Sequence, residues 1–257
     1  MTDGANPSPF PSAQSAAEIA GNLAAVRARI AAAAERAGRK AQEIRLLPIS
    51  KTVPVDRMRM AIAAGCRTFG ENKVQEARRK WEQLVDEGPL DWAIVGHLQT
   101  NKAKYVARFA SEFQALDSLR VAEALERRLQ VEGRALDVLV QVNTSREQSK
   151  FGLAADDAAR FIGQLPQFES LRVRGLMTLA VFSDDTARVR ECFVALRELR
   201  DRLRQGAPDG VALDDLSMGM SGDYEIAIEE GATVVRVGQA IFGARPTPDS
   251  YYWPTPD

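Results

Sequence analysis

The feature of this chain that most limits its possible folds is a regular alternation of short apolar runs and helical patterns. It begins with "EIRLLPIS" followed by "VDRMRMAIAAG" and ends with "TVVRVG" followed by "QAIFG". Counting along the sequence gives about eight strand-plus-helix units, and none opens with the glycine fingerprint of dinucleotide-binding folds. This number favours a closed parallel barrel over an open doubly wound sheet. We therefore predict an α/β protein that is a single (β/α)8 barrel, the TIM barrel.

An additional N-terminal helix is predicted before the first unit. Ser15 and Glu18 have the spacing of a capping box, and apolar residues then recur on one helical face until Gly38. The length of 257 residues fits one barrel domain as well as two small domains, so the count of units decides for the barrel. We expect a disordered tail over 1–14, the barrel over 15–245 and a C-terminal tail over 246–257.

Composition excludes several classes of protein. The net charge of -1 creates no field that would attract nucleic acid or acidic lipid. Cys66 and Cys192 are far apart and His97 is the only histidine, so neither a metal site nor a disulfide framework is expected. The first residues lack the pattern of a signal peptide, and no apolar stretch is long enough to span a membrane. We expect a cytoplasmic protein that is a monomer or weak dimer.

Lys51 directly follows the first predicted strand, which also contains Pro48. Proline removes a hydrogen bond from the strand pairing, so we expect a bulge or an early strand end there. An unpaired ammonium group is costly to bury, yet reactive groups of such barrels collect where the strands end. A lysine there can form a Schiff base with an aldehyde once its pKa falls below the usual value of about 10.4. The alternative is a lysine that reaches solvent or pairs with a carboxylate.

Two glycine-containing loops near the end of the chain predict an anion site. Gly238 and Gln239 join the last strand to a short helix, whose first backbone N–H groups can bind an anion. Ser221 and Gly222 lie in "SMGMSGD" of the seventh unit, and barrels place phosphate after their seventh and eighth strands. Either loop alone is equally well explained as a glycine turn, but two adjacent loops favour phosphate.

Arg236 ends the last predicted strand, among apolar neighbours. It is either a structural ion-pair partner or a donor to a heteroaromatic nitrogen, which it would leave unprotonated. That arrangement weakens the capacity of the ring to store electrons. A lysine, a phosphate site and a cation facing a ring together describe a pocket for pyridoxal 5'-phosphate (PLP).

The sequence resembles the pyridoxal phosphate homeostasis protein family over nearly its whole length. The matching stretches occur in the family's order: "SKT", "RTFGEN" with "VQE", "GHLQTNK", "QVNTS" with "SKFG", "RGLMT", "SMGMSGDYEIAI" and "VRVGQAIFGAR". The resemblance implies a barrel similar to the N-terminal domain of alanine racemases. It also implies that Lys51 holds PLP and that Arg236 faces its pyridine nitrogen. The phosphate contacts implied are Ser221, Gly222, Gly238 and Gln239, and the residues lining the ring are Asn72 and Met177.

The chain departs from the family pattern at a few positions. Gln239 replaces a common threonine or serine, which keeps the backbone N–H group but removes a hydroxyl donor to phosphate. Ala93, Lys73 and Pro48 also replace residues common in the family, and none of these changes removes a predicted PLP contact.

The resemblance implies a carrier that holds PLP as a lysine Schiff base, buffers it and passes it to apo-enzymes, without substantial catalysis. The alternative is a PLP-dependent amino-acid racemase or lyase of low activity, with Lys51 as its base. A hydrolase using Ser221 is disfavoured, because "GMSGD" lacks the G-x-S-x-G spacing of a nucleophile elbow.

Overall fold

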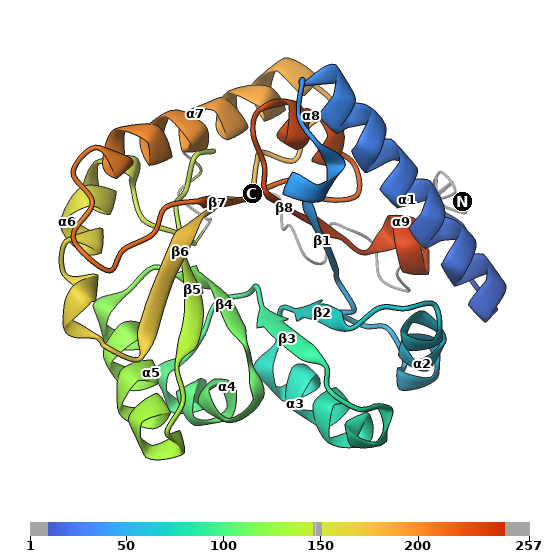
Figure 1. The fold of residues 1–257 in the computed structure, drawn as a ribbon, viewed down its shortest axis with the longest axis horizontal. Coiled ribbons are helices and arrows are strands. Elements are labelled where there is room, and N and C mark those ends of the chain that lie inside the picture. Colours follow the sequence, from blue (N-terminus) through green and yellow to red (C-terminus); the bar gives the residue numbers. More distant parts are fainter. Residues whose placement is uncertain (1–9, 146, 148–150, 245–257) are drawn as a thin grey trace, which may run out of the picture.

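The computed structural model describes residues 10–145, 147 and 151–244 (Figure 1). Residues 1–9 of the expected N-terminal tail, and all of the expected C-terminal tail over 246–257, lie outside the described residues. In the described ranges, no helix combines the length and the apolar character that crossing a membrane requires.

Eight parallel strands form one sheet, in the order β1-β8-β7-β6-β5-β4-β3-β2. The strands are β1 Arg45–Pro48, β2 Thr68–Glu71, β3 Asp91–Ile94, β4 Glu112–Leu116, β5 Leu136–Gln141, β6 Leu171–Met177, β7 Asp215–Ser217 and β8 Val234–Val237. The two end strands of this order meet through a parallel bridge between Ile49 and Gly70, where the Ser50 N–H donates to the Gly70 carbonyl at 2.9 Å. The prediction of a closed (β/α)8 barrel is confirmed.

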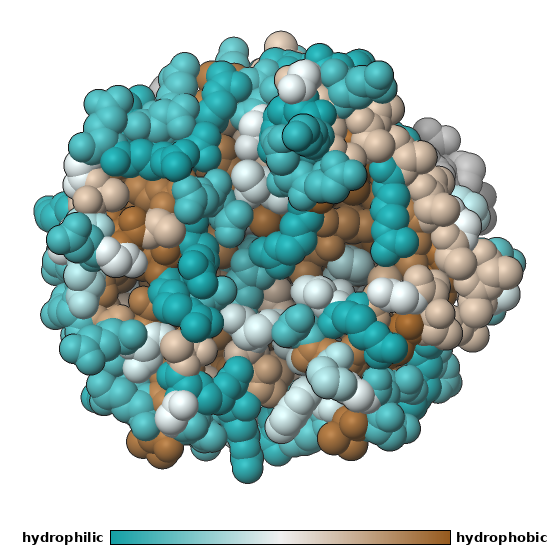
Figure 2. All heavy atoms as spheres, in the orientation of Figure 1, coloured by the Kyte–Doolittle hydropathy of each residue, from teal (hydrophilic) through white to brown (hydrophobic). Residues whose placement is uncertain are grey.

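Helices surround the barrel (Figure 1). The α-helices are α1 Ala16–Arg36, α2 Val55–Ala63, α3 Val74–Gln83, α4 Ala103–Phe109, α5 Leu119–Glu132, α6 Ala158–Ile162, α7 Thr186–Arg204, α8 Tyr224–Glu229 and α9 Gln239–Phe242. Short 3-10 helices are η1 Ala41–Glu43, η2 Val85–Glu87, η3 Thr100–Lys102, η4 Ala155–Asp157 and η5 Leu165–Gln167. Hydrophilic side chains cover much of the face in Figure 2, with hydrophobic residues visible between them.

The additional N-terminal helix α1 starts as predicted. The Ser15 hydroxyl accepts a hydrogen bond from the Glu18 N–H at 3.2 Å, which satisfies one of the unpaired donors of the first turn. The buried face consists of the predicted apolar residues together with two alanines: Ile19, Leu23, Val26, Ile30, Ala33 and Ala34. Through this face α1 packs against α2, α8 and α9.

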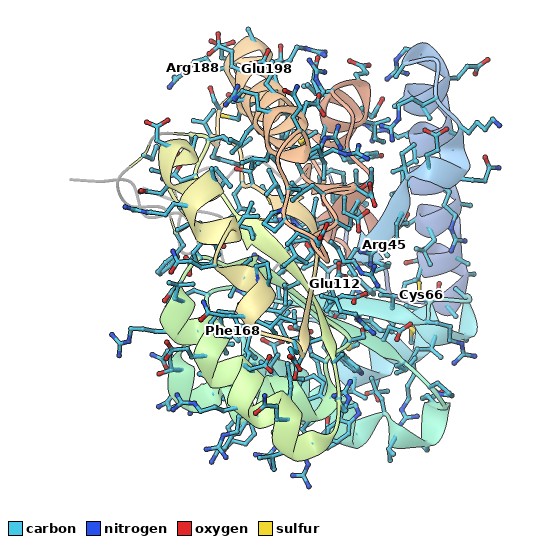
Figure 3. All side chains as sticks on the ribbon, turned by 60° about the vertical axis from the view of Figure 1, so that its left-hand side comes forward. Arg45, Cys66, Glu112, Phe168, Arg188 and Glu198 are labelled. Carbon is cyan, nitrogen blue, oxygen red and sulfur yellow. The ribbon has the colours of Figure 1, made fainter. Side chains whose placement is uncertain are left out.

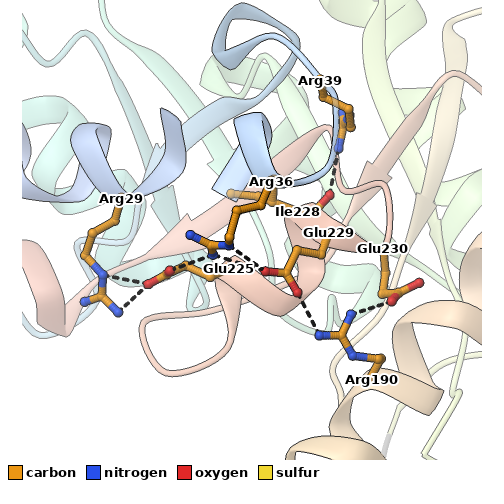
Figure 4. Close-up of polar contacts among 8 residues, drawn as sticks. All are labelled: Arg29, Arg36, Arg39, Arg190, Glu225, Ile228, Glu229 and Glu230. Carbon is orange, nitrogen blue, oxygen red and sulfur yellow. Dashed lines mark hydrogen bonds and ion pairs between the residues drawn. The ribbon is translucent and has the colours of Figure 1, made fainter. Parts of the chain in front are cut away.

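Ion pairs between arginines and glutamates also attach α1 to the barrel (Figure 4). Arg36 donates to Glu225 and to Glu229 of α8, both at 3.1 Å. Glu229 in turn accepts from Arg190 of α7 at 2.7 Å. Because these groups are partly exposed, each pair adds little stability alone, but the network fixes α8 between α1 and α7.

Pro48 ends β1, so the expected early strand end is confirmed. The Ile49 N–H donates to Val237 of β8, whereas the Ser50 N–H donates to Gly70 of β2. Since N–H groups alternate in direction along a strand, position 48 faces β2. Pairing with β2 begins only at Ile49, so the proline interrupts no ladder hydrogen bond.

The amino-terminal end of the barrel strands holds a partly buried ion pair. Arg45 at the start of β1 and Glu112 at the start of β4 lie close together between the strands (Figure 3). The guanidinium donates to both carboxylate oxygens, at 2.8 and 3.0 Å, and Glu112 is buried. A bidentate pair of this kind satisfies both charges away from the site at the opposite end of the strands.

Gly175 in β6 is predicted to be the glycine least tolerant of substitution. A Cβ atom there would lie 1.9 Å from the backbone oxygen of Asp215 in β7, so the strands must separate to admit it. We expect Gly175→Ala to lower the unfolding free energy by about 3 kcal/mol, measured by urea denaturation. The control is Gly21→Ala at an exposed position of α1, where a Cβ atom would have no neighbour within 4 Å. This substitution should raise the unfolding free energy by up to about 1 kcal/mol. Equal effects of the two substitutions would contradict the close packing of β6 and β7.

Candidate functional site

Two cavities open near the carboxyl ends of the strands, and Lys51 and Met220 line both. The first has a volume of about 240 Å³ and contains Arg236 and Asn72. The second has a volume of about 220 Å³ and contains Ser221, Gly222 and Gln239. The site therefore has one part next to a guanidinium and one part between the last two strand-to-helix loops, with Lys51 common to the two.

The first cavity has apolar walls with a few polar groups. Its lining consists of Ile49, Lys51, Asn72, Val95, Gly96, His97, Gln141, Phe151, Leu179, Met220 and Arg236. At the exposed side, the rings of His97 and Phe151 stack with centroids 4.3 Å apart. A mainly apolar hollow with a few polar groups is typical of a small-molecule site.

The Ser221 hydroxyl joins the two loops that border the second cavity. It accepts hydrogen bonds from the N–H groups of Gly238 at 3.2 Å and Ala240 at 3.4 Å. Gly238 and Gln239 also line a smaller hollow of about 30 Å³ beside Lys51. The β7 and β8 loops thus bring a hydroxyl and backbone N–H groups to one place, and such groups bind anions.

Glycines allow these loops to approach each other. Gly219 has a φ of +91°, and a Cβ atom there would lie 2.6 Å from the Ala227 side chain. A Cβ on Gly238 would lie 3.0 Å from the Ile49 carbonyl oxygen. The turn that carries Ser221 and the close contact of β8 with β1 both depend on the missing side chain.

Arg236 lies in β8, almost fully buried, and its terminal nitrogens donate to protein acceptors. One bonds to the Ser217 hydroxyl and the other to the Thr178 carbonyl, both at 2.7 Å. Ser217 in turn donates to the Gln114 side chain at 2.7 Å. Burial lowers the pKa of Arg236 to about 10, so the guanidinium remains charged at neutral pH. The side chain is therefore a fixed cation at the wall of the first cavity.

Two acids offset this charge, and Asp223 contributes more than Glu112. Burial raises the pKa of the Asp223 carboxyl above its ordinary value, while the N–H of Met220 and the charge of Arg236 lower it. Asp223 accepts a hydrogen bond from the Met220 N–H within its own loop. The carboxylate therefore stabilises both the loop of Ser221 and the buried guanidinium.

Most of the predicted site residues come together. Lys51, Asn72 and Arg236 line the first cavity, Ser221, Gly222 and Gln239 line the second, and Gly238 borders the small hollow beside them. Met177 differs: it is fully buried in β6 and, among the described residues, is not one that lines any of these hollows. Leu179, two residues later, lines the first cavity.

Sequence reasoning missed several residues of the first cavity, among them Gln141 and Leu179. Gln141 carried a usable signal, because it is a polar residue at the end of the apolar run "LDVLVQ". Its amide donates to the Phe151 carbonyl at 3.1 Å and so connects β5 to the cavity rim. Leu179 carried no such signal, since an apolar residue after a strand is unremarkable.

Within the described residues, no group of three or more histidine, cysteine, aspartate or glutamate side chains is placed to hold a metal ion. The donors and the cation of the site instead suit a molecule with an anionic end, an aromatic body and a group that reacts with an amine.

Comparison with known proteins places this barrel in a class. Residues 21–246 match the model of the alanine racemase N-terminal domain family. The crystal structure of alanine racemase from Streptomyces lavendulae superposes with a TM-score of 0.70 at 17% identity, over 91% of this chain and 59% of that chain. At that identity the likeness shows the fold alone, a racemase-type parallel barrel.

More similar relatives narrow the class. The pyridoxal phosphate homeostasis protein of Pseudomonas aeruginosa is 43% identical over 227 residues, covering 88% of this chain and 96% of that protein. The homologue of the same name from Escherichia coli K12 is 41% identical over 89% of this chain and 97% of its own length. The structure of PipY from Synechococcus elongatus with PLP bound has a TM-score of 0.78 at 35% identity, covering 88% of this chain and 100% of that chain. The chain belongs to the pyridoxal phosphate homeostasis protein family.

Proposed function

We propose that this protein binds PLP for cofactor homeostasis, holding it as a Schiff base on Lys51 and buffering or delivering it. The observation that carries the proposal is that Lys51 lines both cavities, one beside the Arg236 guanidinium and one beside the loops joined by Ser221. The names of the relatives, and the PLP in the PipY structure, support the same cofactor. Delivery to apo-enzymes and a cytoplasmic location are parts of this proposal.

The residues of the site fit PLP. The Ser221 hydroxyl, which accepts from the N–H groups of Gly238 and Ala240, can donate its own proton to a phosphate. The wall residues Ile49, Val95 and Leu179 offer apolar contact to a ring. When bound, PLP supplies an aldehyde that condenses with an amine and a ring that can accept electrons. Arg236, held by Ser217 and Thr178, can donate to the ring nitrogen and would keep it unprotonated.

A ring nitrogen kept unprotonated by Arg236 would let the ring store negative charge only poorly. This argues against aminotransferase and decarboxylase activity, and leaves slow racemisation as the alternative to a carrier. The alternative, a racemase or lyase of low activity with Lys51 as its base, rests on the shared fold of racemases. Sustained turnover of amino acids would distinguish the enzyme from the carrier.

The test begins with the purified protein loaded with PLP, reduced with borohydride and digested for mass spectrometry. We expect the label on Lys51 alone; a label on another lysine, or none, would contradict the proposed binding mode. The loaded protein is then incubated with D- and L-amino acids and, separately, with an apo PLP enzyme. Reactivation of the apo-enzyme without amino-acid turnover supports the carrier, and sustained turnover supports the racemase or lyase.

Ser221 provides a prediction that is specific for the phosphate. Ser221→Ala removes the hydroxyl that joins the two loops and can donate to phosphate. We expect PLP affinity to fall about tenfold while affinity for pyridoxal, which lacks the phosphate, changes by less than about twofold. Fluorescence titration with both compounds measures the ratio. Equal losses for the two compounds would show that Ser221 does not contact the phosphate.

A further inference from the structure

A buried cluster of charged residues from β2 and α3 contacts the chain next to Lys51. Lys80 of α3 is 2% exposed and Glu71 at the end of β2 is 0% exposed. The Lys80 ammonium group donates to Glu71 at 2.7 Å, to Glu76 at 2.7 Å and to the Ser50 carbonyl at 2.6 Å. A lysine amine has three protons, so these contacts use them all.

The cluster contacts the chain on both sides of Lys51. Before it, the Ser50 carbonyl accepts from Lys80, and the Ser50 hydroxyl donates to Glu71 at 2.7 Å. After it, the Thr52 N–H donates to Glu76 at 2.7 Å. The backbone of the reactive lysine is thus fixed at its two neighbours by groups that belong to α3 and β2.

The conformation of Thr52 shows why such fixing is needed. Its φ is +65°, and within the described residues it is the one non-glycine residue with a positive φ. This region is unfavourable for a β-branched side chain, so the surrounding contacts must hold it there. Besides the bond to Glu76, its hydroxyl donates to the Lys51 carbonyl at 2.6 Å. The left-handed turn directly follows the residue that enters both cavities.

We propose that Glu76, with Lys80 and Glu71, is a positioning residue for Lys51: it holds the Ser50–Thr52 segment in the turn that directs the Lys51 amine into the cavities. The inference rests on the proposed function, in which Lys51 forms the bond to PLP. It extends that function to three residues that are not among the described residues lining the cavities of the site.

Substitutions of Glu76 test this proposal, because its side chain is partly exposed and its loss leaves Glu71 paired with Lys80. Glu76→Ala removes the acceptor for the Thr52 N–H, whereas Glu76→Gln keeps a side-chain oxygen there and removes only the charge. We expect Glu76→Ala to slow formation of the Lys51 adduct with PLP, followed by its absorbance, about tenfold. Glu76→Gln should stay within about twofold of wild type. The matched control is Glu82→Ala, an exposed glutamate of the same helix that pairs with Arg78.

A second measurement needs no PLP. Hydrogen exchange of the Thr52 amide should accelerate about tenfold in Glu76→Ala and remain near wild type in the other two variants. A wild-type rate of adduct formation in Glu76→Ala would overturn the positioning role. So would an equal fall in rate in Glu76→Gln, because that result would assign the effect to the charge of Glu76. If wild type forms no adduct at Lys51, the proposed function fails, and the exchange of Thr52 alone then decides whether the cluster holds this turn.

Discussion

Replacing Lys51 with alanine is expected to abolish the covalent adduct with PLP and to raise the Kd at least about 100-fold, or ~2.7 kcal/mol. The amine is the only part of the proposed site that forms a covalent bond, whereas the loops of Ser221 and Gly238 retain their hydrogen bonds. Residual, phosphate-dependent binding should therefore remain. Equilibrium dialysis gives the affinity, and borohydride reduction followed by mass spectrometry shows the loss of the label.

The control for this substitution is Lys104→Ala. Lys104 is an exposed residue of α4 whose ammonium group lies 5.0 Å from the ring centre of Tyr105. The Lys104→Ala variant should bind PLP with the affinity of the wild type. Retention of wild-type affinity and of a reducible adduct in Lys51→Ala would remove the central residue of the proposed function.

Replacing Lys80 with methionine is expected to have the largest effect on stability, a loss of about 3–5 kcal/mol of unfolding free energy. The substitution leaves the buried carboxyl of Glu71 with no cation in contact. Its Oε2 atom already lacks a hydrogen-bond partner among the described residues. Urea denaturation of the wild type and the variant measures the difference.

The unfolding free energy lost through Lys80→Met should become larger as pH rises. Burial raises the pKa of Glu71 to about 7, while the Lys80 charge lowers it, so the substitution raises this pKa further. An unfolded glutamate has a pKa of about 4.3, so the folded state is the one that binds the proton more tightly. The stability from the protonated carboxyl is complete below about pH 4.3 and is lost as pH rises through the folded pKa. That loss continues to higher pH in the variant than in the wild type.

The double variant Lys80→Met with Glu71→Gln is the control. It removes the titrating carboxyl, so the extra pH dependence should disappear and part of the lost stability should return. A constant difference between wild type and Lys80→Met from pH 6 to pH 9 would contradict this account of the cluster.

Much of this fold was predictable because each unit repeats a local pattern. The run "TVVRVG" contains β8, and "QAIFG" contains α9, because an apolar run before a glycine and a helical start are local signals. The functional end of the barrel followed from chain direction alone, since parallel strands place all their carboxyl ends together. Lys51 and Ser221 could therefore be named from their positions after strands, and Arg236 from its position near the carboxyl end of β8.

The rest depends on contacts between distant segments. Ser217 orients Arg236 and donates to Gln114 of β4, a residue 103 positions away, and no pattern in one sequence predicts that contact. The same holds for Met177, predicted to line the ring pocket, where the structure places Leu179 at the cavity instead. Lys80 did leave a signal, because it follows Ala77 by three positions on the buried face of α3. A lysine on an apolar helical face indicates a buried partner, but the spacing does not identify Glu71.

The attachment of α1 has a consequence for the distant end of the chain. The amide of Asn22 in α1 donates to the Ile241 carbonyl in α9 at 3.0 Å, and Arg29 pairs with Glu225 in α8. These two short helices come directly after the loops that carry Ser221 and Gly238. Helix α1 therefore contacts both helices that follow the loops of the proposed anion pocket, although it contributes no side chain to that pocket's described wall. Variants shortened or interrupted within 16–36 are expected to lose bound cofactor under conditions in which the barrel itself remains folded.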